Sequence, residues 1–376
     1  MPVSFAPGRV NLIGEHVDYH GLPVLPMALS RGVRVDFTPR DDGRVILRNA
    51  EARFGERSFP LSPELAPGPG GDWGNYAMAA AVTVADRWGA SVGIRATVTS
   101  DLPSAAGLSS SSALVVAVAQ ALLHASQIRV DPLALAEALA EGEHFVGTSG
   151  GGMDQAASLL GRAGHAVEIS FRPLAVAPVP FPDGWRVVVA HSGVSAEKSG
   201  SAQAAYNQRR AGSADALGAL AEALGVPGMP PRELLTRYGT EALLSRASAL
   251  PAPGGRWAVH TLSEAARVER AVVALGRRDL PAFGELLDAS HASLRDVYEV
   301  SHPRLDALVE AARAAGAVGA RLTGAGFGGC MLAVCAAAAA PQVVEALAAT
   351  QEAMDPPPEI SPFLAFPGEG AHILGE

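Results

Sequence analysis

Residues 8–19, GRVNLIGEHVDY, place an arginine, two carboxylates and an imidazole in one short segment that also contains two glycines. The side chains are those of Arg9, Glu15, His16 and Asp18. Carboxylates and imidazoles hydrogen-bond neighbouring hydroxyl groups, and the glycines allow the backbone to turn sharply. The segment therefore predicts a site for a neutral polyhydroxy ligand, with Arg9 near the reacting oxygen. A solvated loop with local ion pairs is the alternative interpretation.

Residues 103–113, PSAAGLSSSSA, lie where an expected helix over 109–124 begins. Small side chains let backbone N–H groups point at an anion, and the helix dipole favours negative charge there. The serines also suit N-capping, and their hydroxyls are possible Mg²⁺ ligands. The pattern predicts a phosphate-binding segment. A flexible serine-rich linker is disfavoured by the strand pattern before it and the apolar helix pattern after it.

Two further segments are rich in glycine. Residues 150–155, GGGMDQ, place Asp154 where the backbone can press close to a ligand, a position that suits a general base. A capping aspartate at a helix start is the alternative. Residues 321–330, RLTGAGFGGC, predict a strand, a loop and a strand, with more glycines than a hairpin turn needs. This loop is suited to wrap a ligand or another loop.

Composition narrows the class of protein. A chain of 376 residues exceeds what one core usually organises, so we expect two domains with a cleft between them. The formal net charge of -9, without a basic stripe, argues against nucleic acid as a partner. Lys198 is the only lysine and follows Glu197, which excludes both the Walker phosphate loop and the protein-kinase motifs.

Neither membrane nor export signals are visible. The N-terminal segment has no basic region followed by an unbroken apolar stretch, and the apolar run 331–340 is too short to span a bilayer. Cys330 and Cys335 show no metal-ligand or disulfide spacing. We expect a cytoplasmic protein.

Hydrophobic periodicity predicts mixed helices and strands, with a domain change near residue 180. The expected domains are residues 1–180 and 181–376. Strands are expected over 33–37, 45–47, 92–98, 185–190, 317–322 and 330–335, and helices over 109–124, 132–145, 202–224, 261–276, 280–295 and 303–315.

The order and spacing of these motifs resemble the three signatures of the GHMP kinase superfamily, and residues 8–19 resemble the galactokinase signature. Residues 206–210, 260–268 and 290–296 also match, so the resemblance covers nearly the whole chain. It implies an α+β, two-domain GHMP kinase fold. The N-terminal domain would be ribosomal-protein-S5-like and the C-terminal domain ferredoxin-like, with the active site in the cleft between them.

The resemblance also implies a reaction, the transfer of the ATP γ-phosphate to the anomeric hydroxyl of D-galactose, with Mg²⁺. Asp154 would be the catalytic base and Arg9 its partner. A monomer or weak homo-oligomer is expected. The implied sugar-binding residues are Arg9, Glu15, His16, Asp18, Gly151, Asp154 and Tyr206; the ATP-binding residues are Trp73, Ala105, Ala106, Gly107, Leu108, Ser109, Ser110 and Ser111; and the Mg²⁺ ligands are Ser111 and Glu143. A core role for Trp73 is the alternative.

Some positions depart from the usual galactokinase pattern: Val17, His20, Leu22 and Ala105. Residues 103–112 and 147–154 look more like the N-acetylgalactosamine kinase branch, whereas Tyr206 looks like galactokinase proper. An N-acetylgalactosamine 1-kinase is therefore the nearest alternative. A non-catalytic sensor of sugar and ATP is another, and a mevalonate or homoserine kinase is disfavoured by residues 15–19.

Overall fold

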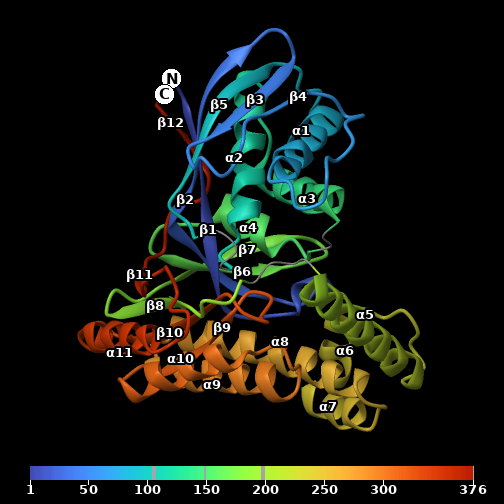
Figure 1. Ribbon diagram of the computed structural model, residues 1–376. Coiled ribbons are helices and arrows are strands. Elements are labelled where there is room, and N and C mark those ends of the chain that lie inside the picture. The colour runs from blue at the N-terminus through green and yellow to red at the C-terminus, as the bar shows by residue number, and fades with distance from the viewer. Residues whose placement is uncertain (104–106, 148–149, 196–199, 376) are drawn as a thin grey trace.

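The computed structural model describes residues 1–103, 107–147, 150–195 and 200–375 (Figure 1). Helices and strands are mixed along the chain, as the α+β prediction requires. None of the helices in these ranges is long and apolar enough to cross a bilayer.

The first sheet has the strand order β12-β1-β2-β5-β3-β4 within the described residues, and only β3 and β5 in it run parallel. Helix α2 packs against β1 and β2 and presents apolar side chains along most of its length. Figure 1 shows α1, α2 and α3 together on one side of these strands. The elements are β1 (Val3–Ile13), β2 (Leu25–Arg40), β3 (Arg44–Asn49), β4 (Arg57–Pro60), β5 (Gly93–Ser100), β12 (His372–Leu374), α1 (Gly74–Trp88), α2 (Ser110–Ala125), α3 (Pro132–Gly142) and α4 (Met153–Leu160).

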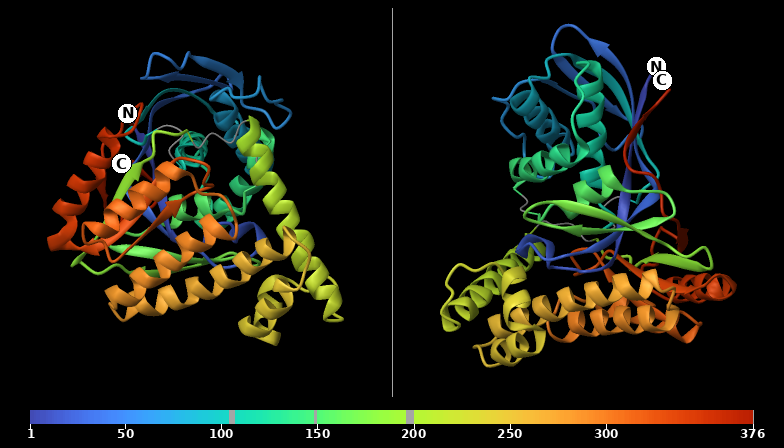
Figure 2. Two further views of the ribbon diagram at one scale, coloured as in Figure 1. Left: turned by 60° about the horizontal axis from the view of Figure 1, so that its bottom comes forward. Right: turned by 180° about the vertical axis from the view of Figure 1, so that it is seen from behind.

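The second sheet is antiparallel in the order β11-β8-β10-β9, and β6 and β7 form a separate pair. Helices α8 to α11 make a layer below the strands, and α5 to α7 stand at one corner (Figures 1 and 2). The elements are β6 (His165–Ser170), β7 (Ala175–Pro180), β8 (Trp185–His191), β9 (Gly319–Thr323), β10 (Cys330–Ala336), β11 (Phe363–Ala365), α5 (Gly200–Ala223), α6 (Pro231–Tyr238), α7 (Thr240–Ser248), α8 (Gly254–Gly276), α9 (Leu280–Asp296), α10 (Pro303–Ala314) and α11 (Ala340–Glu352), with 3₁₀ turns η1 (Asp18–His20), η2 (Glu143–Val146) and η3 (Ala337–Ala339).

All the expected strands and helices are present with shifted ends, but one alternative and one expectation are wrong. The interpretation of residues 8–19 as a solvated loop fails because residues 8–13 belong to the buried strand β1. Serine capping of α2 is also wrong: Ser109 is the N-cap, but its side chain makes no capping hydrogen bond. Its φ of 59° places the backbone in the left-handed region, unlike an ordinary N-cap.

One apolar core runs through both halves of the chain. It joins Val10 of β1 and Leu122 of α2 to Phe283 of α9 and Leu332 of β10. The predicted boundary at residue 180 falls between β7 and β8 and stays a prediction. The C-terminal strand β12 returns to pair with β1, so the last residues complete the first sheet.

Four charged side chains lie where the two sheets meet: Arg321, Glu15 and Glu264 are buried, and Arg267 is half-buried. We call Arg321, Glu15, Glu264 and Arg267 the ionic junction. Arg321 has no exposed surface; its Nη1 donates to the carbonyls of residues 11 and 12 (3.2 and 3.0 Å), and its Nη2 lies 3.6 Å from Glu15 Oε1. Glu264 accepts from Arg267 Nε (2.7 Å) and from the amide of Gly14 (3.0 Å).

The charges in the ionic junction support one another. Burial would raise the pKa of Glu264, but Arg267 and Arg321 lower it to about 2. The carboxylate is therefore ionised at neutral pH. A buried charge is tolerated only when it is paired and hydrogen-bonded, so the junction fixes β9 and α8 against the end of β1.

Removing Arg321 should destabilise the fold strongly, because the buried carboxylates of Glu15 and Glu264 would lose a neighbouring positive charge. We expect Arg321→Met to lower the free energy of unfolding in a denaturant titration by about 3–5 kcal/mol. Arg295→Met, which breaks an exposed pair with Asp296, should cost about 1 kcal/mol or less. Equal losses in the two variants would contradict this role for the junction.

Candidate active site

The centre of the candidate site is an ion pair between β1 and α4. Arg9 Nε donates to Asp154 Oδ1 at 2.8 Å, and Arg9 Nη2 lies 2.7 Å from the same oxygen. Arg9 is 5% exposed, whereas the Asp154 side chain is 21% exposed. Asp154 is the second residue of α4, after N-cap Gly152, and its carboxylate binds Arg9. The capping alternative for Asp154 is therefore wrong.

Arg9 also holds the predicted phosphate segment. Its Nη1 donates to the carbonyl of Gly107 (2.7 Å), and its amide donates to the carbonyl of Leu108 (3.1 Å). A Cβ on Gly8 would lie 2.6 Å from that Leu108 oxygen, which explains the glycine beside Arg9. One side chain thus connects Asp154 to the start of α2.

The backbone around the start of α2 has the geometry of an anion site. Gly107 (φ 77°) and Ser109 (φ 59°) are both in the left-handed region, and α2 begins at Ser110. The first amides of a helix have no intrahelical acceptors, and the helix dipole makes this end positive. Ser109 Oγ is buried and has no hydrogen-bond partner among the described residues. Ala105 and Ala106 lie outside the described residues.

The predicted loop after β9 closes on this segment. A Cβ on Gly324 would lie 3.1 Å from the Gly107 carbonyl oxygen. The amide of Gly324 donates to Glu15 Oε1 at 2.7 Å, and the Thr323 hydroxyl lies 3.2 Å from the same oxygen. The loop over 324–329 therefore wraps another loop, one of the two arrangements that its glycines predicted.

His16 lies among aromatic rings. Its ring centroid is 5.5 Å from that of Tyr206 and 4.8 Å from that of Tyr298. Its Nδ1 lies 2.9 Å from the Tyr19 hydroxyl and its Nε2 3.1 Å from the carbonyl of Ala325. His16 has a φ of 61°, an uncommon conformation for a side chain of this size.

Asp18 and Gly151 meet directly. The Gly151 amide donates to Asp18 Oδ2 at 3.1 Å. A Cβ on Gly151 would lie 2.4 Å from Asp18 Oδ2 and 2.4 Å from its Cγ, so only glycine fits here. This contact brings the first motif to the segment that carries Asp154. Five predicted residues, Arg9, His16, Asp18, Gly151 and Asp154, are thus linked by contacts among the segments that carry them.

The predicted metal ligand Glu143 contacts the start of α2 through a serine that the sequence did not single out. Ser112 Oγ donates to Glu143 Oε1 at 2.8 Å, and both side chains are buried. The pairing of Glu143 with Ser111 stays a prediction. The adjacent serine was overlooked because four serines in a row give no signal of which one turns inward.

Trp73 has the surroundings of a core side chain. It is 9% exposed and joins the main apolar core, and its Nε1 donates to the carbonyl of Gly55 at 3.2 Å. Its predicted contact with adenine stays a prediction.

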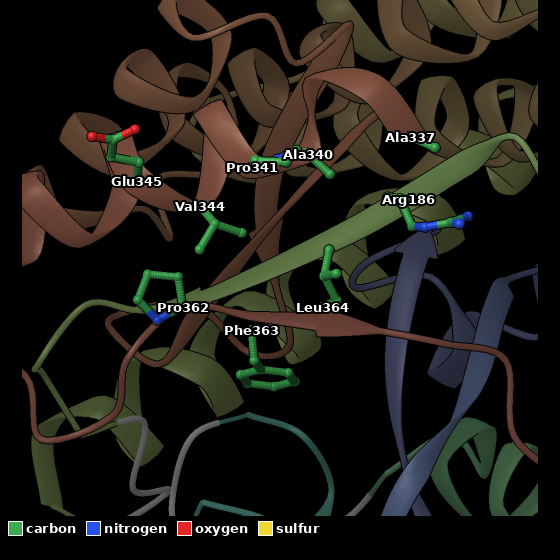
Figure 3. Close-up of a pocket in the computed structure, with 9 residues that line it drawn as sticks. All are labelled: Arg186, Ala337, Ala340, Pro341, Val344, Glu345, Pro362, Phe363 and Leu364. Atoms are coloured by element: carbon green, nitrogen blue, oxygen red, sulfur yellow. The ribbon is translucent and has the colours of Figure 1, made fainter.

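A groove of about 510 Å³ elsewhere, between α11 and β11, is lined by none of the predicted site residues. Figure 3 shows Phe363 and Leu364 of this groove on opposite sides of β11.

Comparison with known proteins identifies the family of this chain. Residues 75–162 match the GHMP kinases N terminal domain, residues 271–353 match the GHMP kinases C terminal family, and residues 2–39 match the galactokinase galactose-binding signature. A galactokinase of Chloroflexus aggregans is 42% identical over 332 residues, which are 87% of this chain and 82% of the relative. The chain belongs to the galactokinase family. Its fold is accordingly the two-domain GHMP kinase fold.

Two further galactokinases support this membership. The Bos taurus galactokinase is 38% identical over 349 residues, covering 90% of this chain and 85% of the relative. The crystal structure of Lactococcus lactis galactokinase complexed with galactose superposes with a TM-score of 0.86 at 29% identity, covering 98% of this chain and 94% of that one. The galactokinase signature over residues 2–39 contains Arg9, Glu15, His16 and Asp18.

A methyl group at residue 151 should disturb sugar binding, because it would push Asp18 out of place. We expect Gly151→Ala to raise the KM for the sugar substrate about tenfold or more, given the cost of overpacking, with a much smaller effect on the KM for ATP. Gly218→Ala is the control, since a Cβ on Gly218 of α5 meets nothing within 4 Å. An unchanged sugar KM in Gly151→Ala would remove Asp18 from the site.

Proposed function

We propose that this protein transfers the γ-phosphate of ATP to the anomeric C1 hydroxyl of D-galactose, giving galactose 1-phosphate and ADP. ATP is the co-substrate of the kinase family to which the chain belongs. The observation that carries the proposal is the position of Arg9, which bonds Asp154 on one side and the carbonyl of Gly107 on the other. A base and a phosphate-binding segment are thus held by one side chain.

In this mechanism Asp154 is the general base. It accepts the proton of the C1 hydroxyl as that oxygen bonds to the γ-phosphorus, and the bond from the γ-phosphorus to the bridging oxygen of ADP breaks. Arg9 orients Asp154 through two short contacts and brings a fixed positive charge to the reacting oxygens. The partial exposure of Asp154 suits a group that must reach a ligand.

The phosphates of ATP would lie against the backbone from Ala105 to Ser111. In the described part of this segment, left-handed residues precede the free amides of α2, an arrangement suited to anion binding. Unlike a Walker loop, the segment contains no lysine, so backbone amides, Arg9 and the helix dipole must supply the positive potential.

The sugar would occupy the side of Asp154 that faces Asp18, Gly151, His16 and Tyr206. The Gly324 amide and the Thr323 hydroxyl lie within hydrogen-bond distance of Glu15 Oε1, and Arg321 Nη2 lies 3.6 Å from the same oxygen; none of these three engages Oε2. We assign Oε2 to a sugar hydroxyl. Hydroxyl groups that bind buried polar partners discriminate strongly between sugars, because an unsuitable sugar leaves those partners unpaired.

Mg²⁺ fits the residues beside the phosphate segment. Glu143 and the adjacent serine hydroxyls are hard oxygen donors at the start of α2. Mg²⁺ commonly takes one or two protein ligands and completes its shell with phosphates and water. Ser111 and Glu143 would hold the ion. When bound, it would neutralise charge on the phosphate oxygens.

The same proposal includes the domains, the compartment, the oligomeric state and the partners of the enzyme. We place the site between the predicted domains 1–180 and 181–376, and we propose a cytoplasmic monomer or weak homo-oligomer without nucleic-acid or membrane partners. Cys330 and Cys335 are both buried and unpaired, as suits a reducing compartment.

The reaction can be tested by ADP release with ATP, Mg²⁺ and a panel of galactose, N-acetylgalactosamine, glucose, arabinose, galacturonate and mevalonate. We expect the highest kcat/KM with galactose. The highest value with N-acetylgalactosamine would contradict the choice of sugar and favour the related 1-kinase. No turnover with any substrate, combined with retained galactose binding, would favour a sensor over an enzyme.

The general base can be tested by Asp154→Asn, which keeps the shape of the side chain but not its basicity. We expect kcat to fall by about 10²–10⁴ while thermal stability changes little. Asp131→Asn is the matched control, because Asp131 caps α3 and asparagine is an equally good cap. Full activity in Asp154→Asn would refute the mechanism.

A further inference from the structure

A chain of buried hydroxyls lies beneath the sugar-binding motif. Tyr298 follows α9 and has no exposed surface. Its hydroxyl lies 2.9 Å from that of Tyr19, which in turn lies 2.9 Å from His16 Nδ1. The Tyr298 ring also packs on His16 and on His260, with centroid distances of 4.8 and 4.5 Å. The mechanism above uses neither Tyr298 nor Tyr19.

With a neutral imidazole at His16, the hydrogen bonds in this chain have one direction. The carbonyl of Ala325 can only accept, so the nearby Nε2 of His16 carries a proton. In a neutral imidazole Nδ1 is then an acceptor, and the Tyr19 hydroxyl donates to it. Having given its one proton to His16, Tyr19 must accept the proton of Tyr298. Burial raises the pKa of both phenols above their ordinary value of 10.0, so both keep these protons at neutral pH.

The other neighbour of Tyr298 does not replace this link. Ser213 Oγ donates to the carbonyl of Arg209 at 2.7 Å, and its distance to the Tyr298 hydroxyl is 3.5 Å. His20 Nε2 lies 2.8 Å from Ser213 Oγ. The proton of Ser213 is thus committed to the backbone. Among the described residues, Tyr298 is the donor that supplies Tyr19.

Tyr298 also anchors the helix that carries Tyr206. Arg209 lies one turn after Tyr206 on α5, and its Nε donates to the backbone carbonyl of Tyr298 at 2.8 Å. The ring of Tyr206 in turn lies 5.5 Å from that of His16 and 6.0 Å from that of Tyr19. Tyr298 therefore contacts two of the segments that carry proposed sugar-binding residues: His16 through its ring, and helix α5 with Tyr206 through Arg209.

We propose that Tyr298 is a positioning residue for sugar binding, which acts by donating a hydrogen bond to Tyr19 and so fixing the orientation of His16. This inference rests on the proposed function. A phenol that accepts a hydrogen bond is a stronger donor itself, so loss of the Tyr298 hydroxyl weakens the bond from Tyr19 to His16. It also leaves a buried oxygen without a donor.

The test compares steady-state kinetics of the wild-type enzyme and Tyr298→Phe, which keeps the ring and removes the hydroxyl. We expect the KM for galactose to rise about tenfold, while the KM for ATP and kcat change by less than about twofold. If Tyr298 only stabilised the fold, Tyr298→Phe would lower the melting temperature and the fraction of active enzyme. It would leave the galactose KM unchanged, because KM does not depend on that fraction. Tyr238→Phe, on α6 in a separate apolar cluster, is the matched control and should leave both KM values unchanged.

Tyr19→Phe keeps the inference testable if Tyr298→Phe does not fold, because it removes the same link from the other side. It should raise the galactose KM at least as much, and Tyr298→Phe added to it should have no further effect. Additive effects, or an unchanged galactose KM in either single variant, would overturn the inference alone. If the wild-type protein turned over no sugar, both the proposed function and this inference would fail.

Discussion

A cation that water cannot reach must find every oxygen it needs within the protein, and in this fold that requirement aligns the two sheets. Arg321 meets part of this requirement: its Nη1 donates to two carbonyls at the end of β1, and its Nη2 lies 3.6 Å from Glu15 Oε1. Its Nε and Nη2 have no hydrogen-bond partner among the described residues. Because Arg321 belongs to β9, its hydrogen bonds to β1 also fix the position of the loop that follows β9. The amide of Gly324 then reaches Glu15, and the same glycine packs on Gly107. Contacts that involve no ligand therefore connect the predicted phosphate segment with the predicted sugar motif.

Strand β1 serves both sides of the proposed reaction. Its pairing with β2 shifts register between residues 7 and 9 and again between 11 and 13. Such irregularities re-aim side chains relative to a regular strand. Between the two shifts, Arg9 turns to Asp154 and the phosphate segment, while the carbonyl of Asn11 accepts from Arg321. The proposed binding of sugar and of phosphate, like the contact between the halves, thus involves a few residues of one strand.

The sequence was informative where residue type alone carries the chemistry. The motifs around Arg9, Gly107, Asp154 and Gly324 could be singled out because glycines and charged residues cluster in them. The structure brings these segments together, and their roles stay predictions. Periodicity also predicted α2, α9 and β10. It missed β1, since an arginine and an asparagine interrupt the apolar pattern and both are buried by tertiary contacts. Ser112 and Tyr298 were not predictable for a related reason: their partners, Glu143 and Tyr19, lie far away in sequence.

The pairing of β12 with β1 has a consequence for biosynthesis. Val3 pairs with Leu374 and Phe5 with His372, so β1 is synthesised long before its partner β12. Until residue 374 is made, β1 is the edge of its sheet and presents unpaired amides and carbonyls to other nascent chains. Arg9 lies on that same strand. Most of the first sheet can therefore pair during synthesis, but β1 stays open to wrong β-pairing until residues 372–374 have been made.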